Sequence, residues 1–112
     1  MRSGLIISLL VFLQGCATFG EPYWKLVRVP LKYDTTIYYK DEYSLSAVCK
    51  VEMRRNVVLH ACTERNENNG TYKIHAGPTY DACIERHEHA HGAGWVHDSR
   101  VPFVKDCGPD EF

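Results

Sequence analysis

Residues 87–97 place the tightest constraint on how this chain of 112 residues can fold. The nine residues before His91 contain no glycine or proline and favour an α-helix. His87 and His91 are four positions apart, so on a helix their imidazoles lie on one face. Gly92 and Gly94 end the helix and allow a sharp turn, which can bring His97 back toward the same point. The sequence therefore predicts a helix, a turn and a third histidine that meets the first two.

Three imidazole nitrogens that converge on one point form a zinc site with a fourth position left for water. Glu88 is rotated by about 100° from His87 on a helix, so its carboxylate lies beside the metal rather than on it. From there it can take a proton from water and pass it to a leaving amine, while the metal polarises a carbonyl. We therefore expect Zn²⁺ at His87, His91 and His97, with Glu88 as general base. A histidine-rich run that binds metal without a specific site is the alternative.

The same five residues follow the pattern His-Glu-x-x-His-x-x-Gly-x-x-His, in the order His87, Glu88, His91, Gly94 and His97. The segment resembles the metzincin metallopeptidases. The resemblance implies zinc ligands at the three histidines, a general base at the glutamate, and an endopeptidase on a zincin-like fold. The glycine has a physical reason as well, because a turn this sharp needs a residue without a Cβ.

The resemblance covers eleven residues, or twelve with Asp98, an aspartate being common after the metzincin motif. Metzincins also carry a methionine turn after the third histidine, whereas Met1 and Met53 both precede it here. No tyrosine follows Tyr80 that could serve as a trailing ligand or oxyanion donor. These departures concern the efficiency of proteolysis more than the metal site. Asp98 itself is either an acceptor that orients a ligand histidine or a solvated loop residue.

The other histidines and Trp95 are not expected to bind the metal. His89 falls about 200° around the helix from His87, which predicts a surface position. His60 and His75 lie in strand-like patterns and are expected to be structural. Trp95 is expected to pack against the turn.

Residues 1–15 are predicted to be a lipoprotein signal peptide. Arg2 supplies positive charge, and residues 5–13 form an apolar run too short to span a bilayer. The sequence Leu13-Gln14-Gly15-Cys16 resembles the lipobox of bacterial lipoproteins. The resemblance implies cleavage before Cys16 and lipidation of its sulfur. An ordinary signal peptide with a cysteine at its cleavage site is the alternative.

The mature chain would then begin with a lipidated tether, residues 16–22, followed by one domain, residues 23–112. Two or more acyl chains, palmitate among them, hold a protein stably at a membrane without a spanning helix. Ala17 after the cysteine resembles outer-membrane sorting in Gram-negative cells. We expect a lipid anchor in the bacterial cell envelope, at the outer membrane and facing the periplasm.

The remaining cysteines, Cys49, Cys62, Cys83 and Cys107, predict two disulfides in an exported domain. We pair Cys49 with Cys62, because they would lie opposite each other in the hairpin described below. We pair Cys83 with Cys107, because Cys83 lies one turn before His87 and the bond would tie the tail to the zinc helix. Cysteine ligation of the metal is the alternative.

The first half of the chain reads as β-strands. Residues 24–31 and 35–39 are rich in β-prone side chains. Residues 44–53 and 57–63 are expected to form a hairpin around the polar residues 54–56.

A turn is expected at residues 66–70 and a short strand at residues 71–76. This strand is either an edge strand that pairs with an extended substrate or an ordinary strand of the sheet. Thr79 is expected to cap a helix that begins at Tyr80 and Asp81.

Together these features predict an α+β fold: a small zincin-like domain with a mostly antiparallel sheet of about four or five strands on one principal active-site helix. The net charge of −1 and the lack of long charged runs argue against nucleic-acid binding. We expect a membrane-anchored zinc peptidase that acts on a peptide or protein. The alternative is a non-catalytic zinc-binding lipoprotein with a structural or scavenging role, for which Cys107, Asp98 or His89 would supply a fourth ligand.

Overall fold

The computed structural model describes residues 24–51, 53, 58–97 and 106–112. The predicted signal peptide (1–15), the tether (16–22), the lipidated Cys16, and Asp98 lie outside the described residues. Within the described ranges, no helix is both long enough and apolar enough to cross a membrane.

Five short strands form two separate sheets in the described chain. The larger sheet has the order β2-β4-β3, in which β4 runs parallel to β2 and antiparallel to β3. The smaller sheet pairs β1 with β5 antiparallel. The bounds are β1 (Trp24–Leu26), β2 (Lys32–Tyr38), β3 (Ala61–Asn66), β4 (Thr71–Ala76) and β5 (Trp95–His97). The α+β class and the mostly antiparallel pairing are therefore confirmed.

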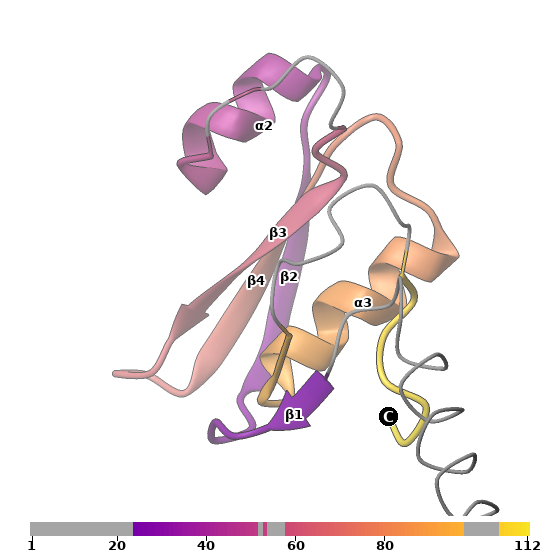
Figure 1. Ribbon diagram of the computed structural model, residues 1–112. Coiled ribbons are helices and arrows are strands. Elements are labelled where there is room, and N and C mark those ends of the chain that lie inside the picture. Colours follow the sequence, from indigo (N-terminus) through magenta and orange to yellow (C-terminus); the bar gives the residue numbers. More distant parts are fainter. Residues whose placement is uncertain (1–23, 52, 54–57, 98–105) are drawn as a thin grey trace, which may run out of the picture.

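Helix α3 (Ala82–Gly92) packs on the three-stranded sheet (Figure 1). Its N-cap is Asp81, whose carboxylate accepts a hydrogen bond from the Ile84 N–H at 3.0 Å, so the expected cap at Thr79 is wrong by two residues. The buried apolar residues come mainly from the central strand and this helix: Tyr72, Ile74, Ala76, Ile84 and Ala90. Alternate residues of β4 share one face of the sheet, so this core fixes the helix over that face.

Residues expected to form a strand instead form helix α2 (Glu42–Cys49). Asp41 caps it by accepting a hydrogen bond from the Ser44 N–H at 2.7 Å, and Glu42 lies in the first turn, where negative charge is favourable. The predicted hairpin between residues 44–53 and 57–63 is therefore wrong. The hairpin partner of β3 is β4, across the turn at residues 66–70, where Gly70 has a φ of +77°.

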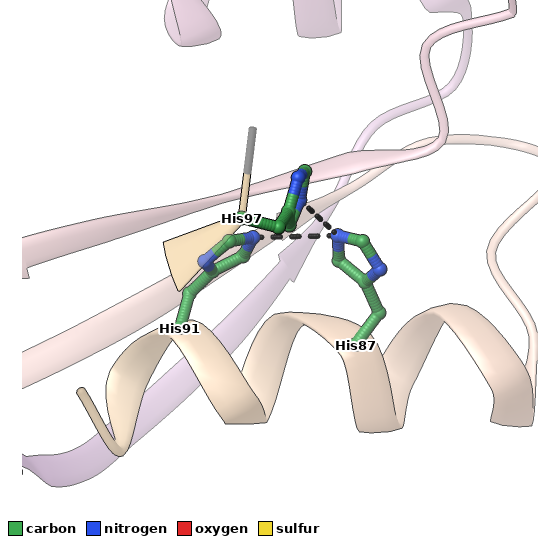
Figure 2. Close-up of side chains that lie close together, drawn as sticks. All are labelled: His87, His91 and His97. Carbon is green, nitrogen blue, oxygen red and sulfur yellow. Dashed lines mark hydrogen bonds between the residues drawn. The ribbon is translucent and has the colours of Figure 1, made fainter. Parts of the chain in front are cut away.

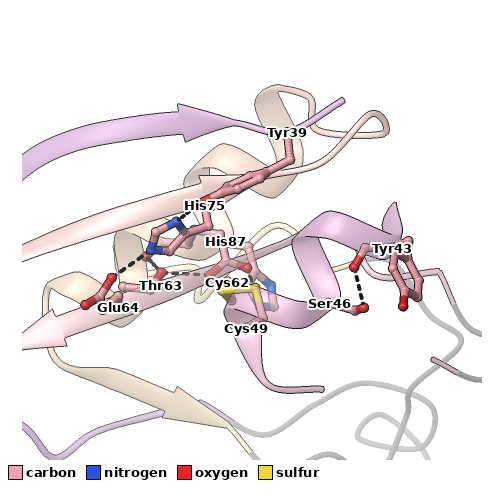
Figure 3. Close-up of a disulfide and its surroundings, with 10 residues drawn as sticks. Tyr39, Tyr43, Ser46, Cys49, Cys62, Thr63, Glu64, His75 and His87 are labelled. Carbon is pink, nitrogen blue, oxygen red and sulfur yellow. Dashed lines mark hydrogen bonds and ion pairs between the residues drawn. A yellow bond between two sulfur atoms is a disulfide. The ribbon is translucent and has the colours of Figure 1, made fainter. Parts of the chain in front are cut away.

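Both predicted disulfides are confirmed. Cys49–Cys62 joins the end of α2 to β3 (Figure 3), although the hairpin that suggested this pairing does not exist. Cys83–Cys107 joins the first turn of α3 to the C-terminal segment. The second bond matters for the site, because it holds the residue before Cys107 close to the helix.

Candidate metal centre

The imidazoles of His87, His91 and His97 converge beside α3 (Figure 2). Nε2 of His87 lies 3.3 Å from Nε2 of His91 and 3.2 Å from Nε2 of His97. Nitrogens bound to one tetrahedral ion at about 2.0–2.1 Å would be about 3.3–3.4 Å apart. Within the described part of the chain, these three side chains are the group that could hold a metal ion, as the sequence predicted.

Backbone carbonyl groups fix the orientation of two of these rings. Nδ1 of His87 lies 2.8 Å from the carbonyl oxygen of Asp106, and Nδ1 of His91 lies 3.0 Å from that of Trp95. A carbonyl oxygen only accepts hydrogen bonds, so each Nδ1 carries a proton and donates it. In the neutral rings Nε2 then presents a lone pair. Two lone pairs 3.3 Å apart repel each other, and a cation bound by both nitrogens would remove this repulsion.

Burial keeps both rings in the form that binds metal. It lowers the pKa of His87 and lowers the pKa of His91 to about 4, and the charge of the neighbouring histidines acts in the same direction. Both imidazoles are therefore neutral at pH 7, so a metal ion does not have to displace protons from them.

Glu88 lies beside the histidines rather than among the ligands. Its Oε2 is 4.0 Å from Nε2 of His87, while its Oε1 accepts a hydrogen bond of 2.7 Å from the Thr63 hydroxyl on β3. The side chain is nearly fully buried, and burial raises the pKa of Glu88 to about 7, against the opposing effect of the Thr63 hydrogen bond. Such a carboxyl group can gain and lose a proton near neutral pH.

The small sheet brings His97 back to the helix. Gly94 has a φ of +108°, and a Cβ on it would lie 2.2 Å from the backbone oxygen of Arg28. The turn therefore needs glycine at this position, as predicted. Beyond the turn, β5 pairs with β1 so that His97 lies opposite Trp24.

Trp24 is a site residue that the sequence analysis missed. Its ring centroid lies 5.0 Å from that of His87, 5.2 Å from that of His91 and 4.5 Å from that of His97. The indole ring of Trp24 thus contacts all three imidazoles. The only local signal was a β-prone tryptophan, and its role depends on a strand pairing across most of the chain.

Asp106 is the second residue that the sequence analysis missed. Besides its carbonyl contact to His87, its Oδ2 accepts hydrogen bonds from Trp24 Nε1–H at 2.7 Å and from Gly108 N–H at 3.0 Å. The sequence left two alternatives for Asp98, this supporting role or a solvated loop position, and Asp98 lies outside the described residues. Asp106 supports His87 because the disulfide at Cys107 brings this part of the tail against α3.

The other histidines are held in the sheet and its surroundings. His75 is buried between Tyr39 Oη and Glu64 Oε1, each at 2.8 Å, which confirms its structural role (Figure 3). His89 points away from the metal group as expected. It is not a surface residue, however, because its Nδ1 lies 2.7 Å from Tyr72 Oη and its side chain is 26% exposed. The helix face opposite the site meets the sheet rather than solvent.

His60 lies just before β3, where its Nδ1 is 2.6 Å from Oγ1 of Thr79. This contact gives Thr79 a role other than the cap expected of it.

A pocket of about 350 Å³ opens at the histidines. Its lining includes the three histidines, Glu88, Thr63, Arg28 and Trp95. The strand beside it is β3, an edge of the larger sheet as described, whereas β4 lies in the centre with a partner on each side. Residues 71–76 are therefore an ordinary central strand, and the idea that they pair with a substrate is wrong.

In comparisons with known proteins, no family model matches the chain, and no curated protein or solved structure is significantly similar to it.

Proposed function

We propose that this chain is a small zincin-like zinc peptidase, anchored to a bacterial membrane by lipid at Cys16. One observation carries the catalytic part of the proposal. Three imidazole nitrogens stand at the spacing of a tetrahedral zinc site, with the buried carboxylate of Glu88 4.0 Å from one of them.

Zinc is the metal that best fits this donor set. It accepts three imidazoles in tetrahedral geometry and needs no further protein ligand at a catalytic site. Copper, nickel and iron also bind imidazole, but copper(II) and nickel(II) favour square-planar or tetragonal arrangements. Bound zinc would supply a Lewis acid that polarises a carbonyl and lowers the pKa of water.

The residues of the chain can then move the protons of amide hydrolysis. Thr63 holds Oε1 of Glu88, which leaves Oε2, the oxygen nearer to His87, to accept a proton from the attacking water. The water oxygen bonds to the carbonyl carbon, and the carbon–nitrogen bond breaks. Glu88 passes its proton to the departing nitrogen, so that the products are a carboxylic acid and an amine.

The location of β3 supports a peptide as the substrate. Ala61, Cys62, Thr63 and Arg65 of this strand line the pocket, and the described sheet ends at β3. An edge strand can bind an extended peptide through backbone hydrogen bonds. We assign to β3 the substrate-pairing role that the sequence analysis had considered for residues 71–76.

A non-catalytic zinc-binding module would need a fourth protein ligand. Cys107 cannot serve, because its sulfur is in a disulfide with Cys83. His89 contacts Tyr72 instead of the metal group. Two of the three candidates for a fourth ligand are thus engaged elsewhere, which favours the peptidase.

The envelope location is proposed from the lipobox-like Leu13-Gln14-Gly15-Cys16. Two disulfides suit such an oxidising compartment. Intact-mass spectrometry of the mature protein should find an acylated N-terminus at Cys16. An unmodified N-terminus at another residue would rule the anchor out.

The decisive variant for catalysis is Glu88→Gln, compared with Glu85→Gln on the same helix, where the side chain of Glu85 is 55% exposed. Glu88→Gln should keep one zinc per chain and lower peptide hydrolysis by about 10²–10⁴-fold, while Glu85→Gln should hydrolyse peptides like the parent. If Glu88→Gln cleaves a peptide library as fast as the parent does, the peptidase assignment is wrong.

A further inference from the structure

Arg28 is held at the mouth of the metal pocket by the turn that also positions His97. Its backbone N–H donates a hydrogen bond of 3.0 Å to the carbonyl oxygen of Gly94, and its own carbonyl oxygen packs against Gly94. Arg28 lines the pocket, together with Glu88 and the three histidines. Its location is therefore set by the same glycine that the motif requires.

The two arginines of the pocket differ in what their guanidinium groups bind. Arg65 is nearly buried, and it donates to the carbonyl oxygens of His91, Gly92 and Val29 and pairs with Glu67. Arg28 is exposed, and its guanidinium makes no hydrogen bond or ion pair with any residue that the structure describes. Arg65 thus holds the end of α3 in place, whereas Arg28 can bind a ligand.

The charges of the pocket favour an anion. Apart from the three histidines, its ionisable lining residues are two arginines, Arg28 and Arg65, and one carboxyl group, that of Glu88. A divalent ion at the histidines would make the pocket more positive still. A guanidinium binds a carboxylate through two parallel hydrogen bonds, which gives both strength and direction.

We propose that Arg28 binds a carboxylate of the substrate next to the bond that is cleaved. This inference rests on the proposed peptidase function and adds its substrate class: peptides with either a free C-terminus or an acidic side chain at that position. The pocket volume of about 350 Å³ fits a short peptide end. It lies near the lower limit of ligand pockets, which span roughly 300–1,000 Å³.

Kinetics on matched peptides test this specificity. Three peptides of otherwise equal sequence are needed: one with a free C-terminus, one amidated, and one amidated with glutamate as its last residue. The parent should show a kcat/KM about 10–100-fold higher for one or both carboxylate peptides than for the neutral amide, mainly through KM. Arg28→Gln should bring that ratio close to one. Lys32→Gln removes the same charge outside the pocket lining and should keep the ratio.

An equilibrium measurement separates this inference from the peptidase proposal. The zinc-loaded Glu88→Gln protein can be titrated with three ligands. They are N-acetyl-alanyl-alanine with a free C-terminus, the same dipeptide with a C-terminal amide, and an amidated N-acetyl dipeptide in which glutamate replaces the last alanine. The carboxylate ligands should bind at least tenfold more tightly, and Arg28→Gln in the same background should abolish the difference. Preferential binding without turnover by the parent would leave Arg28 as an anion site and refute the peptidase. Equal binding of acid and amide, or no binding of the acid, would overturn the role of Arg28 even if peptides are cleaved.

Discussion

His87 donates its Nδ1–H to the backbone carbonyl oxygen of Asp106, 2.8 Å away and 19 residues later in the chain. Two further links hold Asp106 there: the hydrogen bond from Trp24 to its carboxylate and the disulfide of the adjacent Cys107. The C-terminal segment is therefore part of the metal centre. A partner that fixes the Nδ1 proton directs Nε2 at the metal and makes the ring a better ligand.

The disulfide between Cys83 and Cys107 should accordingly be needed for tight metal binding. Replacing both cysteines by serine removes the covalent link and leaves the tail held by hydrogen bonds such as those from Trp24 and Arg86. The carbonyl of Asp106 is then held less firmly against His87. Zinc affinity, measured by competition with a chelator, should fall by about 10–100-fold. The control is the matching double substitution at Cys49 and Cys62, which removes the other disulfide and should affect zinc affinity less. Equal losses in the two proteins would mean that general destabilisation, and not the tail, is responsible.

Gly94→Ala should be far more damaging than Gly70→Ala, although both glycines have positive φ. A Cβ at Gly94 would lie 2.2 Å from a backbone oxygen of Arg28, whereas a Cβ at Gly70 would meet nothing within 4 Å. We expect Gly70→Ala to cost about 1–2 kcal/mol in the free energy of unfolding. Gly94→Ala should cost more than about 3 kcal/mol and also weaken zinc binding through His97. Urea denaturation and chelator competition check both values. Equal costs at the two positions would contradict the close contact between Gly94 and Arg28.

Zinc-free Glu88→Gln should become more stable than the parent as the pH rises. Burial raises the pKa of Glu88 from its ordinary value of 4.5 to about 7 in the folded state. Between these values the folded chain holds a proton that the unfolded chain has lost, so the stability of the parent falls as the pH increases. Glutamine does not titrate, so the advantage of the variant should grow from pH 4.5 to about 7 and then level off. The total gain should be on the order of 3 kcal/mol.

Urea denaturation at pH 4.5 and pH 8, with a chelator present, measures this gain. Glu85→Gln provides the control for removing a carboxylate from the same helix. A stability difference between Glu88→Gln and the parent that does not change with pH would show that Glu88 is not buried as described.

Local patterns in the sequence were enough to predict the ligand group and the helix that carries it. His87 and His91 are neighbours on any helix, and Gly94 indicates the turn that returns His97. Where competing local signals were present, the prediction failed. A strand was expected over residues 44–53, but Asp41 and Glu42 provide a cap and a favourable first turn, and a helix forms.

Partners far apart in sequence could not be predicted from such patterns. The parallel pairing of β2 with β4, which makes β4 central, depends on the packing of the whole sheet. Trp24 and Asp106 are 82 residues apart, and only the fold brings both against the histidines. The cysteines were the exception, because four cysteines allow few pairings. Cys83 lies one helical turn before His87, and this position suggested a bond that ties the tail at Cys107 to the helix.

A crystal structure of the zinc-loaded protein is the direct test of the proposed metal centre. We expect one zinc ion with Nε2 of His87, His91 and His97 at about 2.0–2.1 Å and a non-protein oxygen as the fourth ligand. We also expect Glu88 close to that oxygen but not bound to the ion. A fourth ligand from the protein, or zinc that binds away from the three histidines, would contradict the proposal.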